Sequence, residues 1–244
     1  MASDRTLAAT RLLTRPLYLQ VRDIMIERIG KAEWKPGTAI PNEVELAREF
    51  GLSTGTIRKA LDHLEAERAV TRKQGRGTYV TDQSSDALVS RFWRIGGADG
   101  RPLAADAKTI ECAEASASEE ERRRLRLRPN DHVYRIHGVC LNRGLAFMVE
   151  DASLPSALFP GLLEKKDVAH RIGAIAQRYG ILLGRAEERI SIGTVSTTIA
   201  TRLCVAPNTP VLRLDRLLLT LDGRPLEWRI AHCHLPGGFY LAEM

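Results

Sequence analysis

The chain has 244 residues, of which 44% are hydrophobic and 27% are charged, the composition of a soluble globular protein. Its length exceeds the about 70 to 80 residues that one small domain needs and leaves room for a second domain. No apolar run approaches the roughly 18 residues that span a membrane, and the N-terminus lacks a signal-peptide core, so we expect a cytoplasmic protein with no membrane partner. Residues 1–80 carry 14 Lys and Arg against 10 Asp and Glu, a net charge of +4 out of +6 for the chain, which favours a polyanionic partner at this end.

The chain is expected to begin with a tail and a helix. Residues 1–14 show no clear pattern, and we expect a disordered tail there. From Leu17 to Ile29 apolar residues recur at helical spacing, which predicts a helix. Pro36-Gly37 then predicts a turn.

Two more helices are predicted after this turn. Asn42 is a favourable N-cap, and Glu45 three residues later can complete a capping box. Gly51 suits the end of this short helix, and Ser53 can cap the next one. The second helix has a stripe of apolar residues at offsets of three, four and seven, namely Ile57, Ala60, Leu61 and Leu64.

A small hairpin completes the first domain. Segments 70–72 and 78–80 read as strands on either side of a basic, Gly-rich turn. Two helices joined by a tight Gly turn and followed by a hairpin form a winged helix-turn-helix, which places its second helix in the DNA major groove. We therefore predict a DNA-binding domain over residues 15–80.

A polar segment separates this domain from the rest of the chain. Residues 81–86 (Thr-Asp-Gln-Ser-Ser-Asp) indicate an interdomain linker, which we place at 81–89. Beyond it, strands and helices alternate without a βαβ rhythm, which predicts a largely antiparallel sheet domain over residues 90–244. The fold class predicted for the whole chain is α+β.

An internal repeat supports this second domain. Segment 125–136 matches segment 203–214 at a constant offset of 78 residues, with Leu, Pro, Asn, Val and Arg coinciding. The expected N-caps Ser118 and Ser196 keep the same offset. Each copy predicts a helix, a Pro-Asn turn and a strand that returns through a hairpin. Two such units would pair into one sheet with a pseudo-two-fold axis.

The outward face of the second helix in the first domain carries groups suited to DNA. Ser53, Thr54 and Thr56 have short hydroxyl side chains that can bond phosphates or base edges, and the helix start adds a phosphate site. Arg58 can bind the O6 and N7 atoms of guanine or clamp a phosphate. The predicted DNA-binding residues are Asn42, Ser53, Thr54, Thr56, Arg58, Lys59, Arg72, Lys73, Gln74, Gly75 and Arg76.

Five segments of the first domain resemble the N-terminal domain of GntR-family bacterial transcriptional regulators. They are Pro16-Leu-Tyr-Leu-Gln20, Pro36-Gly-Thr-Ala-Ile-Pro-Asn-Glu43, Leu46-Ala47, Leu52-Ser-Thr-Gly-Thr-Ile-Arg-Lys-Ala-Leu61 and Gln74-Gly-Arg-Gly-Thr-Tyr-Val80. The resemblance implies a homodimer on a near-palindromic operator of double-stranded DNA, with Gln74 and Gly75 in the minor groove. Asn42 stands where the family usually has Ser, and Thr54 stands where it often has Arg. We therefore expect an operator that departs from the usual consensus.

The remainder of the chain, from about Ser90, resembles the UTRA effector-binding domain of the HutC branch of that family. The motifs that carry this likeness are Asn130-Asp131, Val149-Glu150, Leu154-Pro155, Tyr179-Gly180 and Asp222-Gly-Arg-Pro-Leu-Glu227. The resemblance implies a chorismate-lyase-like sheet that binds a small polar or anionic metabolite. It implies that Arg135, Glu150 and Glu227 line the effector pocket, with Ser90 and Arg91 as further anion contacts. Arg185 and Tyr240 are additional candidates.

Strand alternation adds His137 to this candidate pocket. Arg135 and His137 share one strand face. If Arg143-Gly144 form a two-residue hairpin loop, His137 lies opposite Glu150, and the three groups could grip a metabolite together. The alternative is that Arg135 and Glu150 form only a cross-strand ion pair.

The cysteines and histidines give no clear metal site. Cys112, Cys140, Cys204 and Cys233 form no C-x-x-C pair, so we expect free thiols. His232 and His234 would share a strand face and could offer two ligands, but no further spaced His or Cys lies nearby. We expect no metal, no cofactor and no catalytic residues.

Three functional classes remain open from the sequence. The leading hypothesis is a repressor whose effector favours a dimer geometry that misplaces the recognition helices, which lowers operator affinity by linkage. The second is a lyase-like enzyme, although the sequence shows no catalytic triad or phosphate loop. The third is a constitutive DNA-binding protein whose pocket is vestigial.

Overall fold

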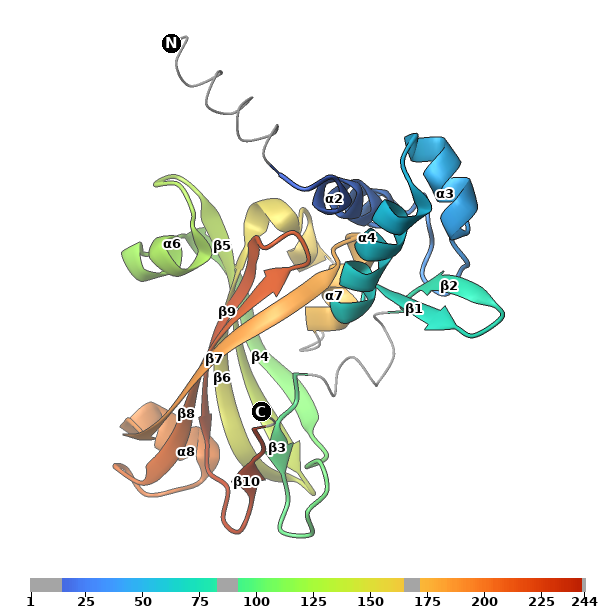
Figure 1. The fold of residues 1–244 in the computed structure, drawn as a ribbon. Coiled ribbons are helices and arrows are strands. Elements are labelled where there is room, and N and C mark those ends of the chain that lie inside the picture. Colours follow the sequence, from blue (N-terminus) through green and yellow to red (C-terminus); the bar gives the residue numbers. More distant parts are fainter. Residues whose placement is uncertain (1–14, 83–91, 165–171, 243–244) are drawn as a thin grey trace. The chain divides into compact units, whose positions relative to one another are not determined.

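The computed structural model describes residues 15–82, 92–164 and 172–242. Its contacts divide the chain into two compact units, Met1–Asp82 and Gln83–Met244. The tail predicted at 1–14 and nearly all of the predicted linker, residues 83–89, lie outside the described residues. Figure 1 shows both units, and each is considered by itself below.

The first unit has the elements predicted for a winged helix-turn-helix. Its elements are α2 (Leu17–Gly30), α3 (Glu43–Phe50), α4 (Thr54–Ala66), β1 (Val70–Lys73) and β2 (Gly77–Val80). The last two form an antiparallel hairpin. Met25, Leu46, Ile57, Leu61 and Leu64 are almost completely buried in its core. The apolar stripe predicted for the recognition helix is therefore confirmed.

Local hydrogen bonds fix the ends of α3 and α4. Asn42 accepts from the backbone N–H groups of Val44 and Glu45, and the Glu45 carboxylate accepts from the Asn42 N–H, which confirms the capping box. Gly51 follows α3 in the left-handed region, with φ of 64°, a conformation that glycine adopts without steric cost. Ser53 caps α4 by accepting from the Thr56 N–H.

The second unit contains one antiparallel sheet of six strands in the order β4-β5-β6-β9-β8-β7. The strands are β4 (Asp106–Ser116), β5 (His132–Asn142), β6 (Leu145–Pro155), β7 (Leu183–Thr194), β8 (Pro210–Thr220) and β9 (Pro225–Cys233). The predicted antiparallel α+β fold is therefore confirmed.

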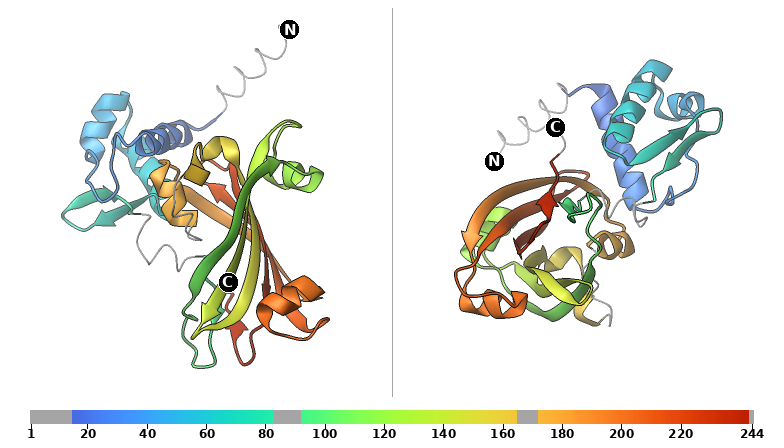
Figure 2. Two further views of the ribbon diagram at one scale, coloured as in Figure 1. Left: turned by 180° about the vertical axis from the view of Figure 1, so that it is seen from behind. Right: turned by 90° about the horizontal axis from the view of Figure 1, so that it is seen from below.

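The strand order and the helices follow the predicted pseudo-two-fold symmetry. Helices α6 (Glu119–Leu125) and α8 (Thr197–Leu203) have bounds exactly one repeat of 78 residues apart, and β5 and β8 keep the same offset. The first half contributes β4, β5 and β6, and the second half contributes β7, β8 and β9 in mirrored order. Figures 1 and 2 show α6 and α8 at opposite ends of the same side of the sheet.

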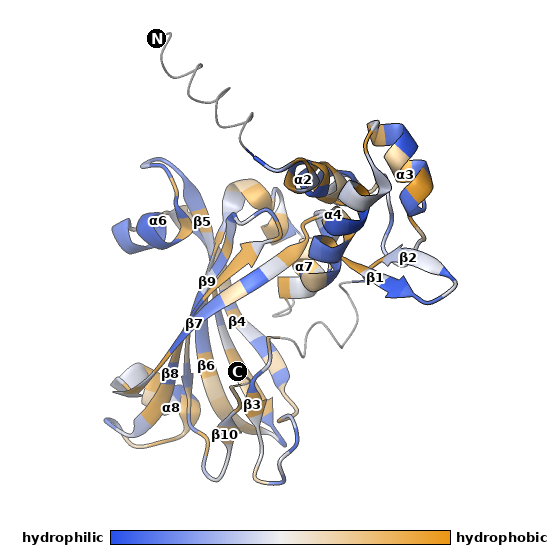
Figure 3. Ribbon diagram, viewed as in Figure 1, coloured by the Kyte–Doolittle hydropathy of each residue, from blue (hydrophilic) through white to orange (hydrophobic). Residues whose placement is uncertain are grey.

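Different helices and strands cover the two faces of the six-stranded sheet. We call the face under α6 and α8 the outer face; Val133 and Leu217 pack there with α6, and Val149 and Val211 pack there with α8. The other face, the inner face, packs against α7 (Ile172–Arg178), the short helices η1 (Ser156–Leu158) and η2 (Leu162–Glu164), and the strand pair β3 (Ile95–Gly96) and β10 (Phe239–Tyr240). Figure 3 shows how hydrophobic residues recur along the central strands, whereas α6 is mostly hydrophilic.

Candidate functional site

The start of α4 presents its polar side away from the core of the first unit. Ile57, Ala60 and Leu61 are buried, whereas Ser53, Thr54, Arg58 and Lys59 are exposed and Thr56 is half-buried. The Ser53 and Thr56 hydroxyls are 2.9 Å apart. Lys59 lies with its Nζ 4.2 Å from the centre of the Tyr18 ring. Hydroxyl and cationic side chains therefore share one exposed face at the start of α4.

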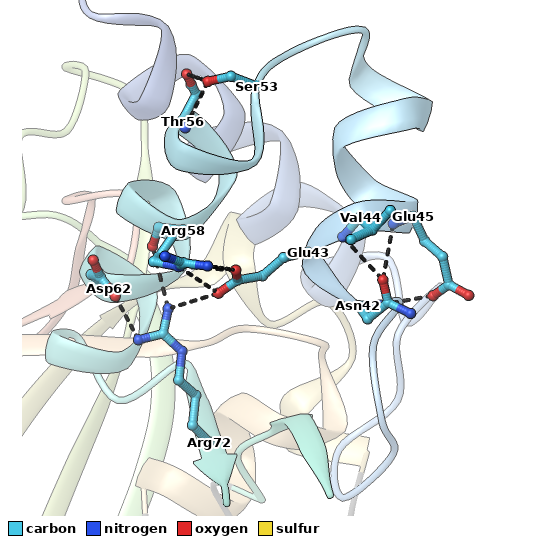
Figure 4. Close-up of polar contacts among 9 residues, drawn as sticks. All are labelled: Asn42, Glu43, Val44, Glu45, Ser53, Thr56, Arg58, Asp62 and Arg72. Atoms are coloured by element: carbon cyan, nitrogen blue, oxygen red, sulfur yellow. Dashed lines mark hydrogen bonds and ion pairs between the residues drawn. The ribbon is translucent and has the colours of Figure 1, made fainter. Parts of the chain in front are cut away.

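Arg58 is held by a carboxylate from the neighbouring helix. Its Nε donates to Glu43 Oε2 at 3.0 Å and its Nη2 donates to the same oxygen at 2.8 Å (Figure 4). The Arg58 side chain remains 64% exposed. Because the carboxylate takes the side edge of the guanidinium, the end edge stays available for an acceptor on DNA.

Arg72, which is also predicted to bind DNA, is the arginine with the most side-chain contacts near α4. Its Nη1 donates to Asp62 at 2.5 Å and to Glu65 at 3.2 Å, and its Nη2 donates to the Arg58 carbonyl oxygen at 3.3 Å (Figure 4). The Arg72 backbone N–H also donates to Glu65. These bonds join the first wing strand to α4, so Arg72 helps to orient the wing, and its contact with DNA stays a prediction.

The tip of the wing carries the exposed charge that the sequence predicted there. Lys73, Gln74, Gly75 and Arg76 are all exposed. Gly75 has φ of 69°, and a Cβ on it would meet no atom within 4 Å, so the glycine is required by backbone conformation rather than by crowding. Lys73 lies over the Tyr79 ring, with Nζ 4.4 Å from its centre.

In the second unit, the predicted grouping of Arg135, His137 and Glu150 is wrong. Asn142 pairs with Leu145, so Arg143 and Gly144 do form a two-residue loop. A bulge then shifts the register between Cys140 and Leu141, and His137 pairs with Asp151 while Glu150 pairs with Gly138. Because successive residues of a strand point to opposite faces, this one-residue slip moves Glu150 to the inner face.

Arg135 and His137 instead complete polar contacts on the outer face. Arg135 donates to both carboxylate oxygens of Glu121, at 2.8 and 2.7 Å, and Ser153 donates to Glu121 at 2.7 Å. Burial by itself would raise the pKa of Glu121, but the bonds from Arg135, Ser118 and Ser153 lower it to about 2. His137 Nδ1 lies 2.5 Å from Asp151 Oδ1. The Arg135–Glu121 pair therefore joins β5 to α6.

The inner face carries two buried ion pairs, and the arginine of each pair was not predicted from the sequence. Arg229 donates to Glu150 at 2.7 Å, and Arg216 donates to Glu227 at 3.0 Å. Arg216 also donates to the Phe92 carbonyl oxygen at 3.2 Å. The sequence did hold one signal for Arg216: the 78-residue offset aligns it with Gly138, so the two repeats differ at this position.

A cavity adjoins these pairs at the Arg216 end. It has a volume of about 250 Å³ and is lined by Phe92, Arg94, Arg185, Ala186, Glu188, Arg216 and Tyr240. Tyr240 donates its hydroxyl hydrogen to Glu188. The predicted effector residues Arg185 and Tyr240 thus line one cavity, and Ser90 and Arg91 lie outside the described residues. Glu150 and Glu227 border a second, much smaller space of about 10 Å³, which is the size of one water molecule.

The described part of the chain has no cluster of metal ligands, and its cysteines are unpaired. No group of three or more His, Cys, Asp or Glu side chains there could hold a metal ion. All four cysteines are free thiols, as predicted. No helix among residues 15–82, 92–164 and 172–242 is long and apolar enough to cross a membrane.

The chain resembles characterised regulators along most of its length. It is 26% identical over 215 residues to the mannosyl-D-glycerate transport/metabolism system repressor MngR of Escherichia coli, covering 88% of this chain and 90% of that protein. It is 29% identical over 153 residues to the histidine utilization repressor of Pseudomonas putida, covering 62% of this chain and 61% of that protein.

Solved structures have the same fold. The ligand-binding domain of a GntR-family regulator from Bordetella bronchiseptica aligns with a TM-score of 0.58 at 27% identity, covering 63% of this chain and 97% of that one. PhnF from Mycobacterium smegmatis aligns with a TM-score of 0.52 at 22% identity, covering 88% of this chain and 94% of that one.

Two family models match the two units. The model described as bacterial regulatory proteins of the gntR family matches residues 17–80, and the UTRA domain model matches residues 100–235. Regulators of this type bind DNA operators and small-molecule effectors and are not enzymes. This confirms the predicted regulator function and argues against the lyase-like enzyme. The chain therefore belongs to the GntR family of bacterial transcriptional regulators and carries a UTRA domain.

Proposed function

We propose that this protein is a dimeric repressor that reads a near-palindromic operator with α4 and the wing, and that a small polar metabolite bound on the inner face of the second unit changes its operator affinity. The observation that carries the DNA-binding part is the exposed, capped start of α4 beside the basic wing tip. Helix N-termini and exposed Arg and Lys side chains are the groups that contact phosphates and base edges.

The cavity at Arg216 is the proposed effector site. It lies among charged side chains on a covered sheet face, where polar groups can fix a ligand. It is lined by Phe92, the first described residue of the second unit. The hydrogen bond from Arg216 to the Phe92 carbonyl oxygen ties this end of the described unit to the cavity wall, so a ligand that moves Arg216 would also act on Phe92.

The edge strand β7 is the proposed contact between two copies of the chain. Its 12 residues include Ile190, 44% exposed, and Ile192, 80% exposed. A long edge strand with exposed apolar side chains invites pairing with another chain unless something covers it. A second copy pairing there would bury both isoleucines and hold two DNA-binding units together.

Selection of DNA from a random pool by the full-length protein tests the proposed function. We expect enrichment of two inverted half-sites, with centres about one helical turn or a multiple of it apart. Arg58→Ala should weaken binding to the selected sequence by at least about tenfold, whereas Lys31→Ala, an equal loss of charge at the end of α2, should change it little. Failure to enrich any sequence would contradict the proposal.

The mass of the protein in solution tests the dimer contact. Ile192→Lys should convert the dimer to a monomer, because it places a charge in the paired edge. Leu145→Lys is the matched control, since Leu145 is 76% exposed at the β5–β6 hairpin. A dimer that persists in Ile192→Lys would exclude β7 as the contact.

A further inference from the structure

The two halves of the sheet are not equivalent at one position of the inner face. Arg216 of β8 and Gly138 of β5 are one repeat of 78 residues apart, and each lies in the strand next to the central pair β6-β9. Gly138 pairs with Glu150, and Arg216 pairs with Arg229. The second half therefore places a guanidinium where the first half has no side chain.

One hydrogen-bond donor of the buried Arg216 side chain has no acceptor among the described residues. Its side chain is only 5% exposed, and its two hydrogen bonds go to Glu227 and to the Phe92 carbonyl oxygen. Its Nε is buried and has no hydrogen-bond partner among the described residues. A buried donor without an acceptor costs about 1–3 kcal/mol, so an acceptor placed beside this atom would stabilise the protein.

The electrostatic environment of Arg216 also disfavours its charge. Burial lowers the pKa of Arg216, and the nearby positive charge of Arg229 lowers it further, against the opposing effects of Glu227 and Glu188. An added negative charge beside Arg216 would compensate this positive charge and supply an acceptor at the same time.

The cavity wall next to Arg216 suits an anion more than a cation. Three arginines, Arg94, Arg185 and Arg216, line it together with one carboxylate, Glu188, which accepts a hydrogen bond from Tyr240. Arg185 is paired at 2.9 Å with Glu187, which is not part of the lining. The Phe92 ring lies over the Arg216 guanidinium, 6.0 Å from its carbon, and offers an apolar surface beside the charge. A volume of about 250 Å³ is below the roughly 300–1,000 Å³ of sites for drug-sized ligands, which favours a small metabolite.

From these observations we infer that the cavity is an acid-binding subsite of the second repeat, in which Arg216 binds the carboxylate or phosphate of a small metabolite whose body lies against Phe92. The inference rests on the proposed effector response for its biological meaning, but the binding itself is independent of DNA. Guanidinium groups form the strongest and most directional hydrogen bonds that proteins offer to these two acids.

Thermal unfolding of the full-length protein tests the subsite directly. The probes are acetate, lactate, malate and glycerol 3-phosphate, each titrated at constant ionic strength against chloride, with acetamide and glycerol as uncharged counterparts. We expect a saturable rise in Tm with at least one acid and no comparable rise with the uncharged compounds. The carboxylates and the phosphate ester distinguish the two kinds of acid. The inference is overturned if no acid gives a saturable rise.

Substitutions of Arg216 test whether the rise in Tm with an acid depends on this side chain. Arg216→Lys keeps the positive charge beside Glu227 but removes the Nε–H donor and the planar fork, so the affinity for the acid should fall at least about tenfold. Arg213→Lys is the matched control, because Arg213 lies on the outer face of the same strand, where it pairs with Asp215. Equal stabilisation of wild type and Arg216→Lys would place the anion elsewhere.

A second variant distinguishes the loss of acid binding from the loss of the fold. Arg216→Met combined with Glu227→Met removes both partners of the buried pair, a replacement that proteins often tolerate. This variant should unfold cooperatively and lose the response to the acid. Operator binding by the same variants separates the two proposals: an acid that binds through Arg216 without changing operator affinity contradicts the effector role and leaves the subsite intact.

Discussion

The carboxylate of Glu43 holds the guanidinium of Arg58 across the joint between α3 and α4. One Glu43 oxygen accepts from both Nε and Nη2 of Arg58, and Glu43 also lies 3.9 Å from Arg72. Glu43 is the first residue of α3, so its position follows from the Asn42 cap that begins this helix. A carboxylate in this place restricts the motion of an exposed arginine before DNA arrives, which lowers the entropy lost on binding.

Glu43→Gln should therefore change how the protein distinguishes DNA sequences. Removal of the negative charge should strengthen binding to random DNA several-fold, and the loosened Arg58 should reduce the preference for the selected operator by about tenfold. Fluorescence anisotropy with the two DNAs measures both affinities. Glu49→Gln, which removes a charge from the other end of α3 where Glu49 pairs with Arg28, should leave the preference unchanged. An unaltered preference in Glu43→Gln would mean that Arg58 needs no support.

Asn42→Ala should lower the stability of the first unit by about 1 kcal/mol, because the side chain accepts from two N–H groups at the start of α3. Asn42→Ser keeps a capping oxygen and should cost less than half of this. Urea unfolding followed by circular dichroism gives both values. A stable Asn42→Ala protein with weakened operator binding would assign Asn42 to DNA contact instead.

Arg76→Ala should weaken binding to all DNA sequences alike. Arg76 is exposed at the wing tip, so its charge is available to phosphate. The slope of log affinity against log salt should become shallower by about 1. Arg72→Ala is expected to differ, since Arg72 bonds Asp62 and Glu65, and its loss should lower stability. A changed base preference in Arg76→Ala would show that the wing reads sequence.

Acid should destabilise the second unit through Glu121. Its folded pKa of about 2 lies below the ordinary value of 4.5, so its contribution is present above about pH 4.5 and is lost as the pH falls towards 2. The shift corresponds to about 3 kcal/mol at most. Glu121→Gln should remove most of this pH dependence of the unfolding free energy. Glu120→Gln, on the exposed side of the same helix with its side chain 59% exposed, should retain it.

The sequence determined those features whose causes are local. The capping residues Asn42 and Ser53 bond backbone groups within three positions, so their neighbours in the chain are enough to predict them. The stripe from Ile57 to Leu64 follows from helical periodicity alone. The 78-residue repeat likewise predicted the pseudo-symmetry, because both copies share one hydrophobic pattern and therefore one fold.

Tertiary structure decided which charged groups meet in the second unit. A bulge between Cys140 and Leu141 shifts the β5–β6 register by one residue and moves Glu150 from the side of His137 to the inner face, beside Arg229. A strand has a period of two, so this single step reverses which face Glu150 occupies, and a hairpin loop read from the sequence does not reveal it. The pairing of Arg216 with Glu227 also depends on long-range strand contacts, and only the assembled sheet brings the two charges together.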